Sequence, residues 1–519
     1  ISLSDAVDRG FTVTESAPMD QAIDVLPETT AAFVGRALRG PLNTPVLVTS
    51  FGAFRRFFGD VWTRSSLGPA VQQFFDHGGE RVYIVRVANN ARGAMLCLPA
   101  SGSALVLRAL EPGSTERIRA AVDYDGIDDD NEELFNLTLQ RVDPGTGLVL
   151  DQELFHRVNY REGAEQFVAD SLTTSELARV EKPFPSHRPE PTQGPNAPFD
   201  SSYVEQVQEG SDGQELSDYD LVGSRKNESG LFALQHVERL DLLYLPPPGK
   251  GRDLGLTSIL AAELFCREHA AMLIVDPPAD WLTPEQAVAG IRDTGLASSN
   301  LLGYFPRMIR RDDADRTARV VGGAVAGLLC KLDRTFGPWH DLDQQGLGFK
   351  RNLAPAYEVG AADAHNLSRG SLNNIAAGPA GRARMRSAVT IGGGSAAHRK
   401  FASYPVRRLC LQVINSIDQA TRWAAFEPND ARIAERIRSQ VTAYLSALAN
   451  MGAFADERFI VECDAGMCHR GNGLAHGVTI LVAFHPSGCK EAVFFTLHQT
   501  VAGCRVTSTA FAPVIQDCA

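Results

Sequence analysis

The sequence predicts a folded, multidomain protein of mixed class, with α/β and α+β parts. The chain has 519 residues, which is too long for one ordinary core and favours two to four domains. Hydrophobic residues make up 44% and charged residues 22%, which is the balance of a globular chain and not of a disordered one. Strand-like and helix-like segments alternate along much of the sequence, whereas residues 100–180 contain strand-like runs broken by polar turns.

The charge balance narrows the possible partners. The formal net charge is −12 and the isoelectric point is about 5.5, which argues against broad electrostatic binding to nucleic acid or to an anionic membrane. No apolar run approaches the roughly 18–20 residues that a membrane span needs. The first residues also lack a basic region followed by an apolar one. We therefore expect no nucleic-acid partner, no direct membrane insertion and no signal peptide.

The first 25 residues are thinly apolar and are expected to form an extended arm or to be disordered. Only the stretch GFTVTE (10–15) alternates as a strand does, with Phe11 and Val13 on one side. A strand without a nearby partner in the sequence must pair elsewhere, so an arm strand is our prediction for this segment.

Residues 26–95 read in the order strand, strand, helix, helix, strand. The first helix, FGAFRRFF, has Thr49 or Ser50 as a possible cap and ends at Gly59. Residues 96–200 are expected to form a β-rich insertion that ends in a proline-rich linker, with six prolines from Pro183 to Pro198.

Residues 201–360 alternate as strand, helix, strand, helix and strand, which predicts parallel pairing in an α/β insertion. Residues 361–500 begin irregularly and then contain two amphipathic helices followed by strands. The expected buried stripe of the first helix is Leu409, Val413, Ile417 and Ala420, and that of the second is Ile433, Ile437, Val441, Leu445 and Leu448. Residues 501–519 are expected to form a C-terminal arm.

The search for catalytic motifs is largely negative. Asp276 ends a predicted strand of the α/β segment, where ligands often bind, but an Asp before Pro more often shapes a turn. The acidic run DYDGIDDDNEE (123–133) has its glycine at the wrong position for a calcium loop, which favours a solvated turn. The basic run GRARMR (381–386) is either a solvated loop or a site for an acidic protein surface. We expect no cofactor and no enzyme activity.

Five of the nine cysteines crowd the end of the chain: Cys463, Cys468, Cys489, Cys504 and Cys518. The stretch CDAGMCH (463–469) offers three possible zinc ligands, but no second ligand pair follows, and structural zinc usually draws on two pairs. A C-x-x-C redox motif is absent. Disulfide cross-links, inert thiols and a metal site remain open at this point.

Three stretches together resemble the sheath proteins of contractile phage tails and contractile injection particles. They are residues 30–87, residues 404–430 with the helix behind them, and the paired strands around FIVECD and EAVFFTLHQ. The run VRRL…TRWAAFEPND (406–430) is the specific part. The β-rich and α/β segments also resemble the outer domains of this family.

The resemblance implies a structural protein without catalysis. Family subunits form stacked six-membered rings around an inner tube, and contraction drives the tube through a target envelope. A tube-facing α+β domain is expected from both chain ends, with the two insertions facing outward and both arms adding strands to neighbouring subunits. The implied partners are further copies of the chain, the inner tail tube protein, and baseplate and tail terminator proteins. The implied location is the virion tail, assembled in the bacterial cytoplasm.

The resemblance also assigns roles to particular residues. The helix over residues 431–450 becomes the candidate tube-facing element, with Arg432, Arg436 and Arg438 near its polar face. The crowded cysteines become candidates for disulfides between subunits, because a virion leaves the reducing cytoplasm. The competing readings are an α/β enzyme with an unrecognised site and another structural component of the injection machine.

Overall fold

The structure is a computed structural model of the chain, and it divides into two compact units. It describes residues 22–128, 130–192, 202–249, 251–314, 316–344, 347–378, 381–392, 401–426, 431–463, 477–489, 491–500 and 503–513. The larger unit comprises Glu28–Phe336 and His340–Arg407. The smaller unit comprises Ile1–Pro27, Gly337–Trp339 and Arg408–Ala519. We call them the body and the C-terminal unit.

The body is built on an eight-stranded sheet with the order β17-β16-β13-β12-β11-β1-β3-β2. Six strands from β16 to β3 are parallel, and the antiparallel strands β17 and β2 form the edges. The strands are β1 (Ala31–Gly35), β2 (Val46–Val48), β3 (Val82–Arg86), β11 (Leu242–Tyr244), β12 (Met272–Val275), β13 (Leu301–Phe305), β16 (Asn373–Ala377) and β17 (Ala383–Met385). A separate two-stranded antiparallel sheet pairs β14 (Met308–Arg310) with β15 (Leu353–Pro355).

Helices cover both faces of this sheet, as parallel strands require. On one face Phe33 of β1 packs edge-on against Phe74 of α2. On the other face Ala32 and Leu273 belong to one core with residues of the helices that follow β3, β11 and β12. The helices are α1 (Phe51–Phe58), α2 (Leu67–Asp76), α4 (Asp218–Val222), α5 (Leu256–Glu268), α6 (Pro284–Thr294), α7 (Gly322–Thr335), α8 (Ala361–Arg369) and the 3-10 helix η3 (Gly230–His236).

The predicted order of elements is confirmed in both parts of this sheet. The first part runs β1, β2, α1, α2, β3, and the second runs β11, α5, β12, α6, β13. Ser50 caps α1, since its side chain accepts a hydrogen bond from the Ala53 amide at 3.0 Å. Gly59 ends the helix with φ of 85°, a left-handed conformation that glycine adopts without strain.

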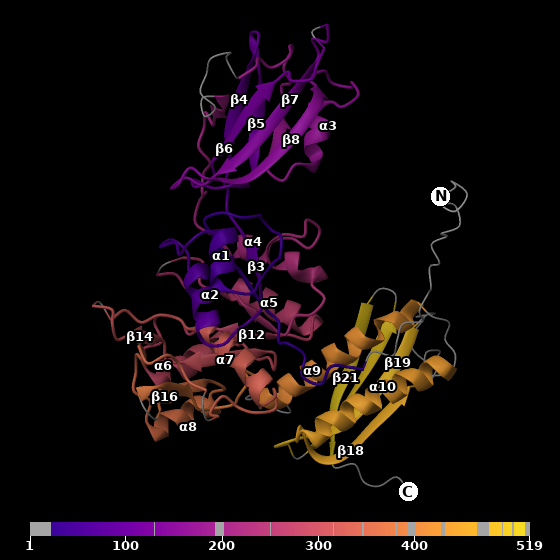
Figure 1. Ribbon diagram of the computed structural model, residues 1–519. Coiled ribbons are helices and arrows are strands. Elements are labelled where there is room, and N and C mark those ends of the chain that lie inside the picture. Colours follow the sequence, from indigo (N-terminus) through magenta and orange to yellow (C-terminus); the bar gives the residue numbers. More distant parts are fainter. Residues whose placement is uncertain are drawn as a thin grey trace, which may run out of the picture. The chain divides into compact units, whose positions relative to one another are not determined.

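The β-rich insertion contains two sheets around a shared apolar core (Figure 1). One sheet has the order β4-β5-β9 and the other β10-β6-β7-β8. The elements are β4 (Gly93–Ala100), β5 (Ser103–Pro112), β6 (Ile118–Asp123), β7 (Leu134–Val142), β8 (Val149–Asn159), α3 (Val168–Ser171), the 3-10 helix η1 (Leu172–Thr174), β9 (Ala178–Glu181) and β10 (Val204–Glu205). Its inward face includes Leu96, Leu107, Val122 and Leu137, all fully buried.

A buried arginine joins this insertion to the body sheet. Arg86 ends β3 and is 2% exposed. Its guanidinium donates to the carbonyl oxygens of Gly40 and Pro112 at 2.6 Å, of Ala37 at 3.1 Å and of Leu38 at 3.3 Å. Burial lowers the pKa of Arg86 to about 10. One cation thus satisfies four carbonyl groups at the point where the chain leaves the sheet.

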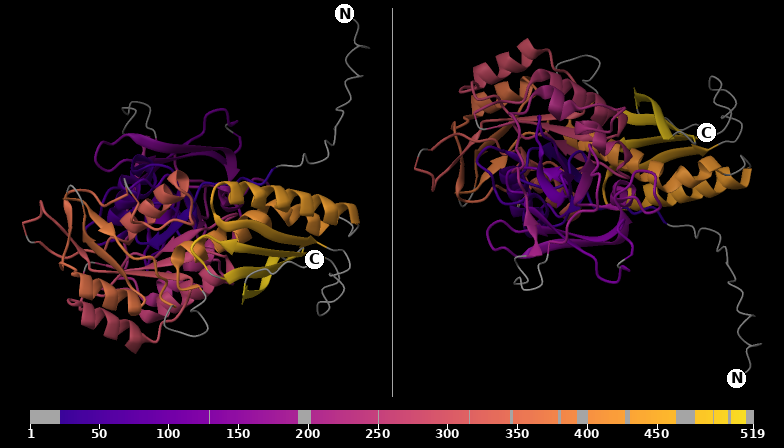
Figure 2. Two further views of the ribbon diagram at one scale, coloured as in Figure 1. Left: turned by 90° about the horizontal axis from the view of Figure 1, so that it is seen from below. Right: turned by 90° about the horizontal axis from the view of Figure 1, so that it is seen from above.

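The C-terminal unit is an α+β structure. Its four-stranded antiparallel sheet has the order β18-β19-β20-β21, and its long helices are α9 and α10. Figure 2 shows the helices, in orange, against one face of the yellow sheet. The elements are α9 (Tyr404–Thr421), the 3-10 helix η6 (Arg422–Phe426), α10 (Ala431–Asn450), β18 (Phe454–Cys463), β19 (Gly477–Pro486), β20 (Glu491–Thr500) and β21 (Gly503–Pro513). Both chain ends contribute to this unit, since the Gln412 side chain donates to the Val25 carbonyl at 2.9 Å.

One grouping differs from the expected one. The sequence predicts that residues 26–95 share one domain with residues 361–500 and that residues 201–360 form a separate α/β insertion. Instead β1 pairs in parallel with β11, so that Ala32 lies opposite Leu243, and the two segments form one sheet. The partners are about 200 residues apart in the sequence, and local patterns do not encode pairing over such a distance. The boundaries of the remaining segments stay predictions.

Candidate functional surfaces

Helix α10 presents one apolar face and one charged face. The expected inward residues Ile437, Val441, Leu445 and Leu448 are fully buried, and Ile433 is half-buried. The helix packs along β18. Burial of this stripe leaves the opposite side of the helix for contacts outside the unit.

The three predicted arginines of α10 have different surroundings. Arg432 and Arg438 are exposed, and Arg438 forms an ion pair with Glu435 one turn earlier. Arg436 is half-buried, and its guanidinium carbon lies 4.4 Å from the ring centre of Trp423, a cation–π contact. The contact of Arg436 with Trp423 was not anticipated from the sequence. A role in facing a tube stays a prediction for all three.

The specific run TRW (421–423) forms the turn that ends α9. The Gln499 side chain of β20 is 1% exposed and donates to the carbonyl of Asp418 at 2.9 Å, to its carboxylate at 2.8 Å and to the Thr421 hydroxyl at 3.0 Å. Arg422 pairs with the same carboxylate at 2.7 Å. This network fastens the end of α9 to the sheet through the buried amide of Gln499.

The outer strands of the C-terminal sheet are long. β18 has 10 residues and β21 has 11, and within the described part of the chain each pairs with a strand on one side only. Unpaired backbone groups along such an edge are a template for an added strand. The predicted arm strand with Phe11 and Val13 lies outside the described residues.

The described cysteines of this sheet lie far from one another. Cys463 ends β18 opposite Ile480, and Cys504 lies on β21 opposite Gln499, three strand intervals or roughly 14 Å away. Cys489 lies in the turn after β19, at the other end of the sheet and roughly 20 Å or more from Cys463. A disulfide needs Cα atoms within about 7 Å. These three residues therefore cannot pair with one another inside one chain.

The remaining C-terminal cysteines were predicted as disulfide partners, inert thiols or metal ligands. Cys468 and Cys518 lie outside the described residues, as does the side chain of Cys504. Cys463 and Cys489 are half-buried and form no disulfide within the described part of the chain. Among the described residues, His, Cys, Asp and Glu nowhere gather in groups of three that could hold a metal ion. The described helices include none that is long and apolar enough to cross a membrane.

Asp276 accepts two hydrogen bonds at the carboxyl end of β12. Its carboxylate accepts from the Tyr244 hydroxyl at 2.6 Å and from the Tyr304 hydroxyl at 2.7 Å. Burial is the main cause that raises the pKa of Asp276 to about 6. Gly322 permits this packing, because a Cβ there would lie 2.2 Å from the Tyr244 ring. The two carboxylate oxygens thus join β12 to its neighbours β11 and β13, and the Tyr304 hydroxyl accepts from the Val321 amide, just before α7, at 2.7 Å. These contacts favour a structural role for Asp276.

The basic run 381–386 is partly structural as well. Ala383–Met385 form the edge strand β17, Arg384 lies 3.9 Å from Asp343, and Arg386 donates to the Ala377 carbonyl at 3.2 Å. Two of its arginines thus have contacts within the body, while Arg382 and Arg386 are exposed, so both interpretations of the run stay predictions.

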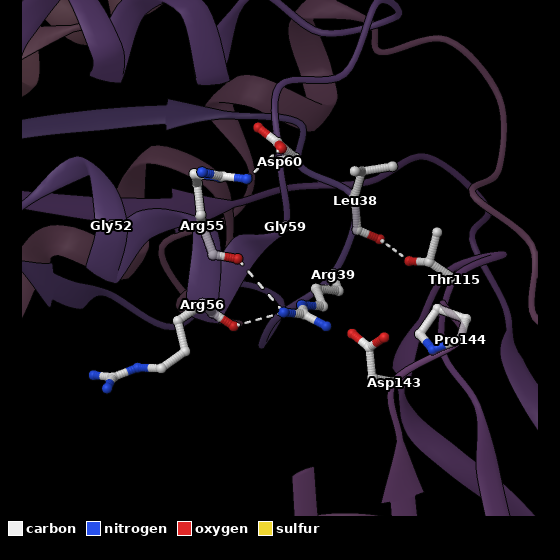
Figure 3. A pocket seen from close by; sticks show the side chains of 10 residues that line it. All are labelled: Leu38, Arg39, Gly52, Arg55, Arg56, Gly59, Asp60, Thr115, Asp143 and Pro144. Carbon is white, nitrogen blue, oxygen red and sulfur yellow. Dashed lines mark hydrogen bonds and ion pairs between the residues drawn. The ribbon is translucent and has the colours of Figure 1, made fainter. Parts of the chain in front are cut away.

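A groove between α1 and the hairpin that joins β7 to β8 was not anticipated from the sequence. We call it the α1 groove; it is an open hollow of about 490 Å³, lined by Leu38, Arg39, Gly52, Arg55, Arg56, Gly59, Asp60, Thr115, Asp143 and Pro144. Figure 3 shows Arg39 between the end of α1 and Asp143, with Arg55 turned towards Asp60. Adjacent arginines in the last turn of a helix were the only sequence signal, and they usually only complement the helix dipole.

Comparison with known proteins shows the fold. No protein-family model and no curated protein matches the sequence. Among solved structures, a sheath tail protein from Listeria innocua is 13% identical and superimposes with a TM-score of 0.60 over 91% of this chain and 95% of that one. A sheath tail protein from Desulfitobacterium hafniense gives a TM-score of 0.54 at 13% identity, over 92% and 98% of the two chains.

A third match comes from an assembled particle. The sheath complex of an extracellular contractile injection system, PVC, in its contracted state gives a TM-score of 0.52 at 13% identity, over 90% of each chain. These matches extend over nearly the full length of each partner, so both units and the insertions are included. The resemblance inferred from the sequence is confirmed at the level of fold: this chain has the fold of the tail sheath proteins.

Proposed function

We propose that the chain is the structural subunit of a contractile tail sheath. The observation that carries the proposal is the match to a sheath tail protein over 91% of this chain and 95% of the other. In this proposal the subunits stack as six-membered rings around an inner tube and contract to drive the tube through a cell envelope. The tube protein, a baseplate and a tail terminator are the proposed partners, and the tail of a virion or a related particle is the proposed location.

The C-terminal unit supports polymerisation by strand addition. Among the described residues, the long strands β18 and β21 each pair on one side only, and such an edge can accept a further strand. An extended arm gains backbone hydrogen bonds on such an edge without needing a core of its own. A contact of this kind joins two different surfaces, and repeated head-to-tail contacts generate a helix when the rotation does not close.

Enzyme activity is the weaker alternative. Its best candidate residue is Asp276, whose pKa of about 6 suits acid–base chemistry. Both of its oxygens are nevertheless occupied by tyrosine hydroxyls of neighbouring strands, at 2.6 and 2.7 Å. Another structural component of an injection machine remains the second alternative, because such components share the need for assembly without catalysis.

Electron microscopy of the purified protein tests the proposal. We expect tubes or striated cylinders with six subunits in each ring. A protein that stays monomeric under all conditions, including in the presence of the cognate tube protein, would contradict the sheath assignment.

We further propose that the terminal cysteines form disulfides between subunits. Support comes from the spacing of Cys463, Cys489 and Cys504, which excludes pairs among them within one chain. On a non-reducing denaturing gel, thiol-blocked particles should run as a ladder that reductant collapses to about 56 kDa, the mass of the chain. A single monomer band without reductant would show that the thiols are inert.

A further inference from the structure

We propose that the α1 groove of one subunit receives the acidic loop of a second copy of the chain. The acidic loop is defined by Asp125, Asp128, Asp130 and Glu132, between β6 and β7. The inference deepens the proposed function, on which it rests, because it names a contact between subunits in addition to strand addition.

The groove offers cationic groups to a partner. Arg55 and Arg56 are exposed in the last turn of α1. Arg55 pairs with Asp60 at 2.7 Å, but both side chains are more than half exposed, so the pair contributes little and can exchange. Arg56 lies over the ring of Phe57, which is 42% exposed. Arginine beside an exposed aromatic ring is typical of protein interfaces.

The remaining arginine of the groove has a structural task. Arg39 is half-buried and donates to the carbonyl oxygens of Arg55 at 3.5 Å and Arg56 at 3.0 Å, which caps the end of α1. Asp143 faces it from the hairpin (Figure 3) and accepts from the amides of Gly145 and Thr146 at 3.0 and 2.8 Å. These contacts shape the groove and leave Arg55 and Arg56 as its available charges.

The acidic loop offers the complementary charges. All four of its carboxylate side chains are exposed, and none forms an ion pair within the described part of the chain. The neighbouring basic residues are already engaged: Arg161 pairs with Glu133, Arg188 stacks on Tyr124, and Arg157 donates to the Gly126 carbonyl. The loop is therefore an anionic projection on the insertion.

The occupant of the groove must be a second copy and not the same chain. The acidic loop and the hairpin of Asp143 lie at opposite ends of β7, which has nine residues and so spans roughly 30 Å. Each subunit carries a net charge of −12, so subunits repel one another on average. Close approach then requires local patches of opposite sign, and the arginines of the groove and the carboxylates of the loop form one such pair.

A charge-reversal experiment tests the contact. One variant carries Arg55→Glu and Arg56→Glu, and the other carries Lys at all four defining positions of the acidic loop, Asp125→Lys, Asp128→Lys, Asp130→Lys and Glu132→Lys. In each variant alone, groove and loop have the same sign, whereas in an equimolar mixture every contact between the two different variants joins opposite signs. We expect each variant alone to associate at least about tenfold more weakly than the unmodified chain, and the mixture to recover most of the loss, in sedimentation velocity at low salt.

Controls separate this inference from folding and from the proposed function. Arg267→Glu with Arg292→Glu reverses two exposed charges in the last turns of α5 and α6, and this variant should associate like the unmodified chain. Circular dichroism should show all variants folded. The inference is overturned if either test variant associates normally, or if the mixture is no better than its components. Cylinders of the unmodified protein in the microscope would still support the sheath assignment in that case.

Discussion

The eight-stranded sheet of the body and the four-stranded sheet of the C-terminal unit have different edge strands. The body sheet ends on β2 and β17, which have three residues each and run antiparallel to their neighbours. The sheet of the C-terminal unit ends on β18 and β21, with 10 and 11 residues. Helices bury both faces of the body sheet, with Phe33, Ile84 and Leu273 fully buried. Of these two sheets, only that of the C-terminal unit has long edges among the described residues, and long edges are suited to pairing with another chain.

In the proposed function, this difference suits the two sheets to different roles: one keeps its shape alone and the other links subunits. A sheet with short edges and covered faces keeps its shape without partners, which suits a part that must move as a block. A sheet with long edges gains hydrogen bonds from a partner strand, which suits a part that links subunits. Four changes to the chain test this difference between the two sheets.

The largest expected effect comes from removing the predicted arm strand. Deleting residues 1–20 should abolish polymerisation while leaving the subunit folded and soluble, because the arm is expected to complete a neighbour's sheet and not its own. Electron microscopy gives the first result and thermal unfolding the second. Full-length sheaths from the truncated chain would show that the arm assignment is wrong.

The second change tests the body alone. Arg86→Met leaves the carbonyl groups of Ala37, Leu38, Gly40 and Pro112 buried without their donor. We expect the free energy of unfolding of the body to fall by about 3–5 kcal/mol in chemical denaturation. Arg81→Met is the matched control: it removes an exposed pair with Glu28 and should cost less than about 1 kcal/mol. Equal losses in both variants would contradict the role of Arg86.

The third change, Asp276→Asn, should remove a pH dependence from the stability of the body sheet. The pKa of Asp276 is raised to about 6 from an ordinary value near 4, so the folded state favours the neutral carboxyl group. Its stabilising contribution is complete below about pH 4 and is lost as pH rises through about 6. Relative to Asp276→Asn, the unmodified chain should therefore lose about 1–3 kcal/mol of unfolding free energy between pH 4 and pH 7. A constant difference over this range would refute the shifted pKa.

The smallest expected effect concerns helix α10 of the C-terminal unit and leaves the edges of its sheet unchanged. Arg432→Glu with Arg436→Glu should weaken attachment to the tube protein by about tenfold, or about 1.4 kcal/mol, in a co-sedimentation assay. Arg432→Lys with Arg436→Lys keeps the charge and should retain most of the binding. Because Arg436 stacks on Trp423, thermal unfolding must show that both variants fold alike. Normal attachment of the glutamate variant would remove α10 from the tube-facing surface.

The local patterns of the sequence were sufficient for most elements. The 3.6-residue period located α10 and its buried stripe of Ile437, Val441 and Leu445, because an amphipathic helix needs only neighbours in the sequence to show its face. The same holds for α1, where Ser50 and Gly59 mark both ends. The resemblance carried by residues 404–430 also pointed to the fold that the solved structures share.

Long-range placement was decided only by the tertiary structure. The pairing of β1 with β11, the contact of Arg436 with Trp423, and the binding of Gln499 to the end of α9 each join segments that are separate in the sequence. Likewise, Arg86 reads as one more polar residue at a strand end, and only the fold surrounds it with four carbonyl groups. Periodicity reports which face of an element is apolar, whereas the identity of the partner depends on the packing of the whole chain.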